Sequence, residues 1–386
     1  MTDLSGIQKA IREEQIDGWL FFNLHHIDPI SDELAAVPRN AINTRKWFYF
    51  VPGTSVPLKI CHTVEAGILD HLPGDKTLYT GKSQLERILS GFKGKRYAAQ
   101  FSENIPSVSY LDLGTAELLF AAGLQLISSS GLIQRIRGIL SENEIASHIR
   151  AADHLYEIVR ILWSRVCDNP DGGLYEKELM EFALKEFQNR HLETEHFPIV
   201  ASGQNTADPH FDPSHSQKKI NSGDVVQFDI WAKEKDGIYA DISWIGFAGR
   251  HPSKEILDCF EAVICARDEA VRMLESSLLR QIPVTGKDVD LAAREILISK
   301  GFEKSIKHRT GHAIDRSLHG WGVNMDGIEF PDDRYILDGS CFSVEPGLYL
   351  KDFGMRSEIN CIRIKEDILV SGPGIQKDLL LLENHK

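Results

Sequence analysis

The sequence predicts an α+β protein of two domains, and three observations support this. The chain has 386 residues, which allows two or three domains at about 150 residues each. Its first part alternates short apolar runs with polar helical patterns. A long amphipathic pattern then begins near Ser141 and is followed by helices interleaved with hairpins. A boundary at about residue 136 gives an N-terminal domain over 1–135 and a C-terminal domain over 136–386.

The N-terminal domain is predicted to be an α/β layer. Apolar runs predict strands at 18–22 and 46–51, and helical patterns predict helices at 66–71 and 83–89. Strands that alternate with helices favour an α/β architecture. His25 and His26 are adjacent, and neighbours on a strand face opposite sides. We therefore interpret them as part of a loop rather than as a metal pair.

The C-terminal domain is predicted to mix helices and hairpins. Ser141-x-x-Glu144 is a capping-box pattern before apolar residues spaced three and four apart, which indicates a long amphipathic helix. Further helices are predicted at 175–189, 254–274 and 289–300, the last ended by Gly301. Strands at 225–229 and 237–244 are joined by the turn Lys235-Asp236-Gly237.

Composition excludes several classes of protein. Hydrophobic residues make up 42% and charged residues 26% of the chain, as in ordinary globular proteins and unlike disordered or collagen-like chains. The net charge of −13 disfavours non-specific binding to nucleic acid. The six cysteines form no CxxC pair, which favours reduced thiols in a cytoplasmic protein. No apolar run approaches the ~18 residues of a membrane helix, and the first residues lack a secretory-signal pattern.

Two aspartates in the predicted hairpin are the first candidate ligands. Asp229 closes an apolar run, and Asp241 follows twelve positions later. An ionised carboxylate is costly to bury without a partner, and two of them across a hairpin repel unless a cation lies between them. The alternative is that one of them is an edge or turn residue in water.

Three further candidates follow in the same domain. His312 lies in a glycine-punctuated segment seven residues before His319. Glu345 closes a second apolar strand before Pro346-Gly347, and Glu358 follows on the next predicted strand. The alternative for Glu358 is an ion pair with Arg356. Taken together, two Asp, one His and two Glu favour Mn²⁺ or a similar divalent ion. Four carboxylates match the charge of two such ions, which together activate a water for hydrolysis.

At this point the sequence resembles the metallopeptidases of the pita-bread fold, which include Xaa-Pro dipeptidase (prolidase), aminopeptidase P and methionine aminopeptidase. The order Asp, Asp, Gly-His, Glu-Pro-Gly, Arg-x-Glu matches the ligand order of that family. Ala201-Ser202-Gly203-x-Asn205 and Gly286-Lys287-x-Val289-Asp290 resemble two further family segments. The first domain resembles that of prolidase, aminopeptidase P and creatinase in length and general pattern. Methionine aminopeptidases lack this domain and match less well.

The resemblance implies a role for each matching residue. The metal ligands would be Asp229, Asp241, His312, Glu345 and Glu358. Glu345 would also be the general base acting on a metal-bridging water. His210 and His319 would contact the scissile carbonyl or the tetrahedral intermediate, and Arg356 would brace the carboxylates. The family implies two divalent ions, Mn²⁺ first, with Co²⁺, Zn²⁺ or Fe²⁺ as alternatives. It also implies a short peptide as substrate, with Xaa-Pro bonds as the target, and a homodimer.

The sequence departs from the family pattern in four places. The Asp–Asp spacing is one residue longer, which an extra residue in the turn would absorb. Ala313 and Asp315 replace two glycines after His312, so an added carboxylate is expected near the site. Asp241-Ile242-Ser243 keeps the usual hydroxyl, and Leu318-His319-Gly320 lacks the usual acid after the histidine. None of these changes removes a ligand.

Two other functions remain open from the sequence. One is a different hydrolase or lyase on the same scaffold, although metal-free members of the creatinase type lose carboxylate ligands that are present here. The other is a non-catalytic binding protein, although such members lack one or more ligands. The sequence does not decide between a dipeptidase and an aminopeptidase, because no motif reports what closes the far end of the cleft.

Overall fold

The computed structural model describes residues 3–170 and 172–382. The chain divides into two compact units, Met1–Ile136 and Arg137–Lys386. The N-terminal unit holds a six-stranded mixed sheet in the order β4-β3-β2-β1-β5-β6. Its strands are β1 Gly18–Asn23, β2 Trp47–Pro52, β3 Leu58–His62, β4 Asp75–Tyr79, β5 Arg96–Ala99 and β6 Gln125–Ser128. Its helices are α1 Leu4–Glu13, α2 Pro29–Leu34, α3 Lys82–Leu89 and α4 Leu113–Ala121, and α5 Ser130–Arg137 ends it.

The helix predicted at 66–71 is wrong. After the short 3₁₀ helix Thr63–Glu65, this segment is a series of turns closed by bonds between residues three apart, such as Asp70 N–H to the Gly67 carbonyl. The apolar run is about two turns long, and so short a helix is not stable without strong packing. Gly67 and the Pro73-Gly74 pair further disfavour an α-helix.

The C-terminal unit contains four helices and ten strands among its described residues. The helices are α6 Glu142–Cys167, α7 Glu176–Asn189, α8 Lys254–Leu279 and α9 Gly286–Ser299. The strands are β7 Leu192–Glu193, β8 Ile199–Ser202, β9 Val225–Glu234, β10 Ala240–Phe247, β11 Cys341–Val344, β12 Gly347–Tyr349, β13 Gly354–Arg356, β14 Ile359–Ile364, β15 Asp367–Val370 and β16 Leu380–Leu381. The capping box predicted at Ser141 and Glu144 starts α6.

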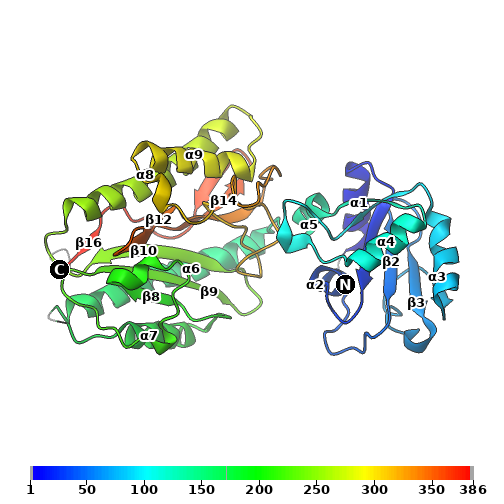
Figure 1. Ribbon diagram of the computed structural model, residues 1–386, viewed down its shortest axis with the longest axis horizontal. Helices are drawn as coiled ribbons and strands as arrows, with labels where there is room; N and C mark the ends of the chain where they lie inside the picture. The colour runs from blue at the N-terminus through cyan, green and yellow to red at the C-terminus, as the bar shows by residue number, and fades with distance from the viewer. Residues whose placement is uncertain (1–2, 171, 383–386) are drawn as a thin grey trace. The chain divides into compact units, whose positions relative to one another are not determined.

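Two hydrophobic clusters hold the helices of this unit against its strands. In one cluster α6 and α7 pack on β9 and β10, and in the other α8 and α9 pack on β11 to β14. Figure 1 shows α8 and α9 on one side of the strands and α7 on the other. The two groups of strands meet where the Glu358 N–H donates to the Ser243 carbonyl at 3.1 Å. The strands therefore form the interior between two outer pairs of helices.

The β9–β10 hairpin sets the positions of the two candidate aspartates. Asp229 pairs with Ser243, and Asp241 pairs with Trp231, so the aspartates are diagonal neighbours. Because side chains alternate with a period of two, both carboxylates lie on the same face of the hairpin. Asp236, in the turn, has a φ of 60°, a left-handed conformation that Asp tolerates better than most residues.

The six cysteines, Cys61, Cys167, Cys259, Cys265, Cys341 and Cys361, are all free thiols. Within the described parts of the chain, no helix has the length and apolar character needed to cross a membrane.

Candidate metal centre

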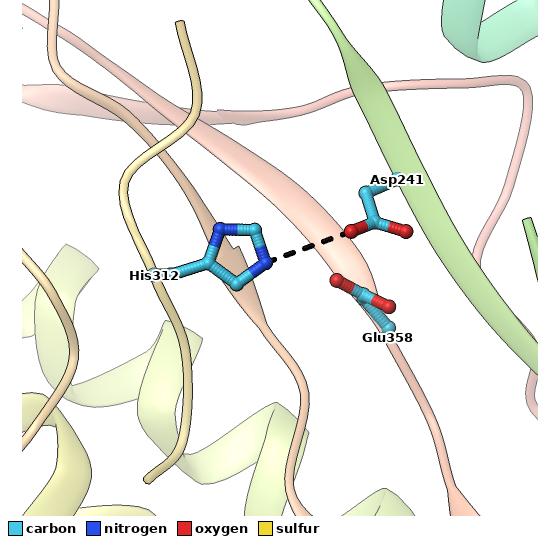
Figure 2. A group of neighbouring side chains, drawn as sticks. All are labelled: Asp241, His312 and Glu358. Atoms are coloured by element: carbon cyan, nitrogen blue, oxygen red, sulfur yellow. Dashed lines mark ion pairs between the residues drawn. The ribbon is translucent and has the colours of Figure 1, made fainter. Parts of the chain in front are cut away.

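Three side chains from separate parts of the chain converge in the C-terminal unit. They are Asp241 of β10, His312 in the loop before β11, and Glu358 between β13 and β14. One potential ligand atom from each lies within 4.8 Å of the other two, and all three residues are buried. Figure 2 shows the three side chains pointing toward a common centre. The tertiary structure thus joins Asp241 and Glu358, which lie more than a hundred positions apart in the chain.

The orientation of His312 suits a metal ligand. Its Nδ1 lies 3.1 Å from the Ala313 carbonyl, which can only accept, so Nδ1 carries a proton. Nε2 faces Asp241 Oδ2 at 3.5 Å and Glu345 Oε1 at 3.4 Å, and although burial alone would lower the pKa of the ring, these two carboxylates raise it. Fixing the far nitrogen of the ring by a hydrogen bond is how proteins orient a ligating histidine.

Two carboxylate oxygens in this cluster have no protein partner. Asp241 Oδ1 and Glu358 Oε1 are buried, and neither accepts a hydrogen bond from the described residues. Burial raises the pKa of both carboxyl groups, and so does the charge of neighbouring carboxylates. A buried oxygen without a partner costs about 1–3 kcal/mol, more if charged. A divalent cation would satisfy both oxygens and offset the repulsion, so the residues fit a metal site.

Asp229 lies beside this cluster but outside it. Its Oδ2 accepts a hydrogen bond from the Arg356 guanidinium, and its Oδ1 lies 2.7 Å from the Ser243 hydroxyl. The same hydroxyl lies 3.2 Å from Glu358 Oε2. Ser243 therefore connects the two carboxylates, and Arg356 neutralises Asp229. The family resemblance implies that Arg356 braces these carboxylates, and this role stays a prediction.

Glu345 lies at the end of β11, where its N–H donates to the Thr310 carbonyl at 2.7 Å. Its Oε1 accepts from the Ser343 hydroxyl at 3.0 Å and its Oε2 lies 3.8 Å from Arg356 Nε. Burial alone would raise the pKa of Glu345, but the charges of His312, His308, Arg356 and Arg309 lower it. Glu345 is therefore ionised near neutral pH.

The cluster lies in a cavity of about 640 Å³ that all seven functional candidates line together with Arg356. The other lining residues are His196, Phe197, Ile199, Pro209, Phe211, Asp212, Pro213, Trp231, His308, Arg309, Leu318 and Glu329. The His319 ring centroid is 4.3 Å from that of His312. His210 is exposed at the rim, after the 3₁₀ helix Gly203–Ala207. The cavity is large enough for a short peptide.

Asp315, which the sequence predicts to be near the site, is not among the described residues that line the cavity. Its side chain is buried and accepts hydrogen bonds from the N–H groups of Ser317 at 2.7 Å and Trp321 at 3.0 Å. A short carboxylate commonly accepts bonds from backbone two residues ahead. It therefore stabilises the loop that carries His319.

Sequence reasoning missed two residues beside the site. The Tyr349 hydroxyl lies 2.7 Å from His308 Nε2 and accepts from Arg356 at 3.0 Å. His308 lines the cavity directly, and burial lowers its pKa. The only available signals were the proximity of Tyr349 to Glu345 and of His308 to His312 along the chain.

Comparison with known proteins supports a peptidase. Residues 144–372 match the model of metallopeptidase family M24. The chain is 26% identical over 291 residues to a probable dipeptidase PepE of Mycobacterium tuberculosis, covering 75% of this chain and 71% of that protein. It is 28% identical over 185 residues to an Xaa-Pro dipeptidase of Lactobacillus helveticus, covering 48% and 46% respectively.

The fold has a close counterpart among solved structures. The crystal structure of dipeptidase PepE from Mycobacterium ulcerans superposes with a TM-score of 0.72 at 20% identity, covering 98% of this chain and 96% of that one. The similarity therefore extends over both units.

Proposed function

The chain belongs to metallopeptidase family M24, and from that premise we propose that it hydrolyses short peptides at Xaa-Pro bonds with two divalent metal ions. Membership of the family makes it a metallopeptidase with the pita-bread fold, as the sequence predicted. The type of peptide bond that is hydrolysed, the number of metal ions and the role of each residue are our proposal.

One observation carries the proposal. Within the described part of the chain, the buried oxygens Asp241 Oδ1 and Glu358 Oε1 accept no hydrogen bond, and they belong to a cluster that also contains His312. Glu345 and Asp229 flank the cluster, so four carboxylates share one buried region. The proposed ligands are Asp229, Asp241, His312, Glu345 and Glu358. Mn²⁺ is the proposed ion, because this oxygen-rich set favours hard cations.

The chain's own residues can perform the proton transfers of hydrolysis. Bound divalent ions supply Lewis-acid polarisation and lower the pKa of water. Glu345 is held ionised and accepts the proton of the attacking water. Burial and the neighbouring His312 lower the pKa of His319, so its ring is neutral and can donate one N–H to the developing oxyanion. His210 at the rim is proposed to contact the same carbonyl.

The Xaa-Pro preference rests on similarity to the Xaa-Pro dipeptidase of Lactobacillus helveticus. The homodimer and the cytoplasmic location stay predictions from the sequence. Light scattering on the purified protein would test the dimer.

A peptide panel combined with metal analysis tests the function. Protein purified without chelator should contain two equivalents of metal and hydrolyse Xaa-Pro dipeptides or Xaa-Pro-Xaa tripeptides faster than Met-Xaa peptides. Asp241→Asn serves as the control, because it removes one ligand and should lose both metal and activity. A single equivalent in fully active protein would contradict the dinuclear site. Preferred cleavage of Met-Xaa peptides would contradict the Xaa-Pro assignment.

A further inference from the structure

We propose that Glu176 is a positioning residue for His210, because its carboxylate ties together the two ends of the loop that carries this histidine. The loop spans residues 203–216 and follows β8. The inference rests on the proposed contact of His210 with the scissile carbonyl, and it identifies what holds the histidine in place for that contact. His210 is exposed, so its position depends on how firmly the loop is held.

The Glu176 side chain joins three segments at the start of α7, where it is fully buried. One carboxylate oxygen, Oε1, accepts from the Ser202 N–H at 2.6 Å and from the Ser202 hydroxyl at 2.8 Å, which fixes α7 to the end of β8. The other oxygen, Oε2, accepts from the Asn205 side-chain amide at 2.8 Å and from the Ser216 hydroxyl at 2.5 Å. A single carboxylate therefore connects β8 with both ends of the loop.

Two side chains from outside the loop hold the part of it that precedes His210. Lys307 Nζ donates to the Ala207 carbonyl at 2.8 Å, and Arg356 Nη1 donates to the Pro209 carbonyl at 3.2 Å. These bonds fix the backbone up to the residue before the histidine. The direction in which the chain continues is then set by the second half of the loop.

The part of the loop after His210 depends on Glu176. Among the described residues, 211–215 form hydrogen bonds only within the loop. The first bond beyond them to another element is the one that Ser216 donates to Glu176 Oε2, and the Glu176 N–H donates to the Lys218 carbonyl at 3.2 Å. The histidine therefore lies between an anchored segment before it and the bonds to Glu176 after it.

A carboxylate suits this role better than a neutral side chain. Its two oxygens offer about four lone-pair sites, so each oxygen can accept two bonds at once. Bonds to an ionised acceptor are about twice as strong as neutral ones, and the helix dipole favours a negative charge at a helix N-terminus. The same bonds also determine the cavity wall, because Phe211, Asp212 and Pro213 of the loop line the cavity.

The Ser216→Ala variant tests the inference, because it removes the bond at the far end of the loop and leaves both bonds from Ser202 in place. Ser216→Thr keeps a hydroxyl at this position. Ser214→Ala is the matched control in the same loop. The hydroxyl that it removes makes no hydrogen bond with the described residues, and Ser214 does not line the cavity.

The nuclear magnetic resonance signals of the His210 ring give a readout that does not require activity. They are recorded on full-length protein labelled at histidine and loaded with Zn²⁺, whose filled d shell leaves the signals sharp, and they are assigned by their loss in His210→Ala. Ser216→Ala should shift or broaden these signals, and Ser214→Ala and Ser216→Thr should leave them near their wild-type positions. Unchanged signals in Ser216→Ala would overturn the inference.

Kinetics with Mn²⁺ on the best peptide test whether the effect passes through His210. Ser216→Ala should lower kcat by about tenfold with KM nearly unchanged, since a displacement of ~1 Å costs up to about 10²-fold, and Ser216→Thr should keep most of the rate. In a His210→Ala background, Ser216→Ala should change kcat by less than about twofold, because residues that act together are not additive. An equal fold-loss in both backgrounds would refute the positioning role.

Glu176→Ala should have a larger effect than Ser216→Ala on the ring signals and on kcat, because it removes all the carboxylate bonds; a smaller effect would contradict the inference. If Glu176→Ala does not fold, the serine variants still decide. A wild-type protein that hydrolyses no peptide would refute the proposed function, and the ring signals would still show whether the carboxylate holds His210.

Discussion

Glu345 illustrates how the surroundings of a single residue determine its chemistry. A buried carboxyl group normally has a raised pKa, as Asp241 and Glu358 do. Glu345 differs because its interactions with His312, His308, Arg356 and Arg309 outweigh its burial. Glu345 is thus kept ready to accept a proton, while Asp241 and Glu358 each have one oxygen that accepts no hydrogen bond from the described residues and is suited to a cation.

Replacing Glu345 by Gln should lower turnover by at least about 10²-fold, because it removes the proposed base and one negative charge. The measurement is kcat on the best peptide with metal in excess. Glu329→Gln is the control, since it makes the same change at another carboxylate lining the cavity and should keep most of the activity. An equal loss of turnover in the Glu345 and Glu329 variants would show that the loss of a negative charge, rather than the loss of a base, lowers the rate.

Replacing His319 by Ala should leave the metal content near wild type and still lower the rate, because its proposed contact is with the developing oxyanion. Elemental analysis and kcat are measured on the same preparation. His215→Ala, which changes an exposed histidine outside the cavity lining, should alter neither. Loss of metal from the His319 variant would show that this residue is structural or a ligand.

At the scale of elements, the loop between His312 and β11 depends on a carboxylate that replaces a family glycine. Asp315 accepts two backbone N–H groups within the loop. A Cβ added to Gly320 would meet the Asp315 carboxyl carbon at 2.7 Å, so the loop closes only with glycine there. The two residues together determine where His319 lies.

Asp315→Ala should therefore act through His319. Loss of the two hydrogen bonds that the buried Asp315 carboxylate accepts should destabilise the protein by about 1–3 kcal/mol. It should also lower kcat/KM, because the His319 ring is displaced. In a His319→Ala background the same change should cost little further activity, because residues that act together are not additive. A full double-mutant cycle measures this, with urea unfolding in parallel. The same fold-loss in both backgrounds would show that Asp315 acts independently of His319.

At the scale of the whole molecule, the site depends on the packing of the C-terminal unit. Two helix pairs bury the outer faces of the strands, and the ligands project from the inner segments. Each ligand is on a different strand, strand end or loop. The clustered carboxylates repel one another unless a cation lies between them, so the metal should contribute to folding stability as well as to chemistry.

Removing the metal should lower the melting temperature of the protein. An ion at about a hundred times its Kd stabilises the folded state by about 2.7 kcal/mol, which corresponds to several degrees for a unit of this size. Calorimetry before and after chelation, with Mn²⁺ added back, measures the shift. Asp241→Asn should not respond to added metal to the same extent. An unchanged melting temperature on chelation of the wild type would indicate that no ion is held.

Local sequence patterns predicted much of the fold and the five proposed metal ligands, and the family resemblance added His210 and Arg356. The capping box at Ser141 and the glycine after α9 are interactions between residues close in sequence, which a pattern can reveal. The segment 66–71 was misassigned because a short apolar run has no fixed helical preference. The directions of Asp315 and Tyr349 depend on partners that no local pattern specifies.

The sequence by itself determined the fold class, the family resemblance and the order of the candidate ligands, because these follow from residue type and spacing. The tertiary structure alone decided how these residues meet. It joined Asp241, His312 and Glu358, turned Asp315 away from the cavity and engaged Arg356 with Asp229. These outcomes depend on contacts between residues far apart in the chain. Such contacts stabilise the protein only after the strands and helices have packed.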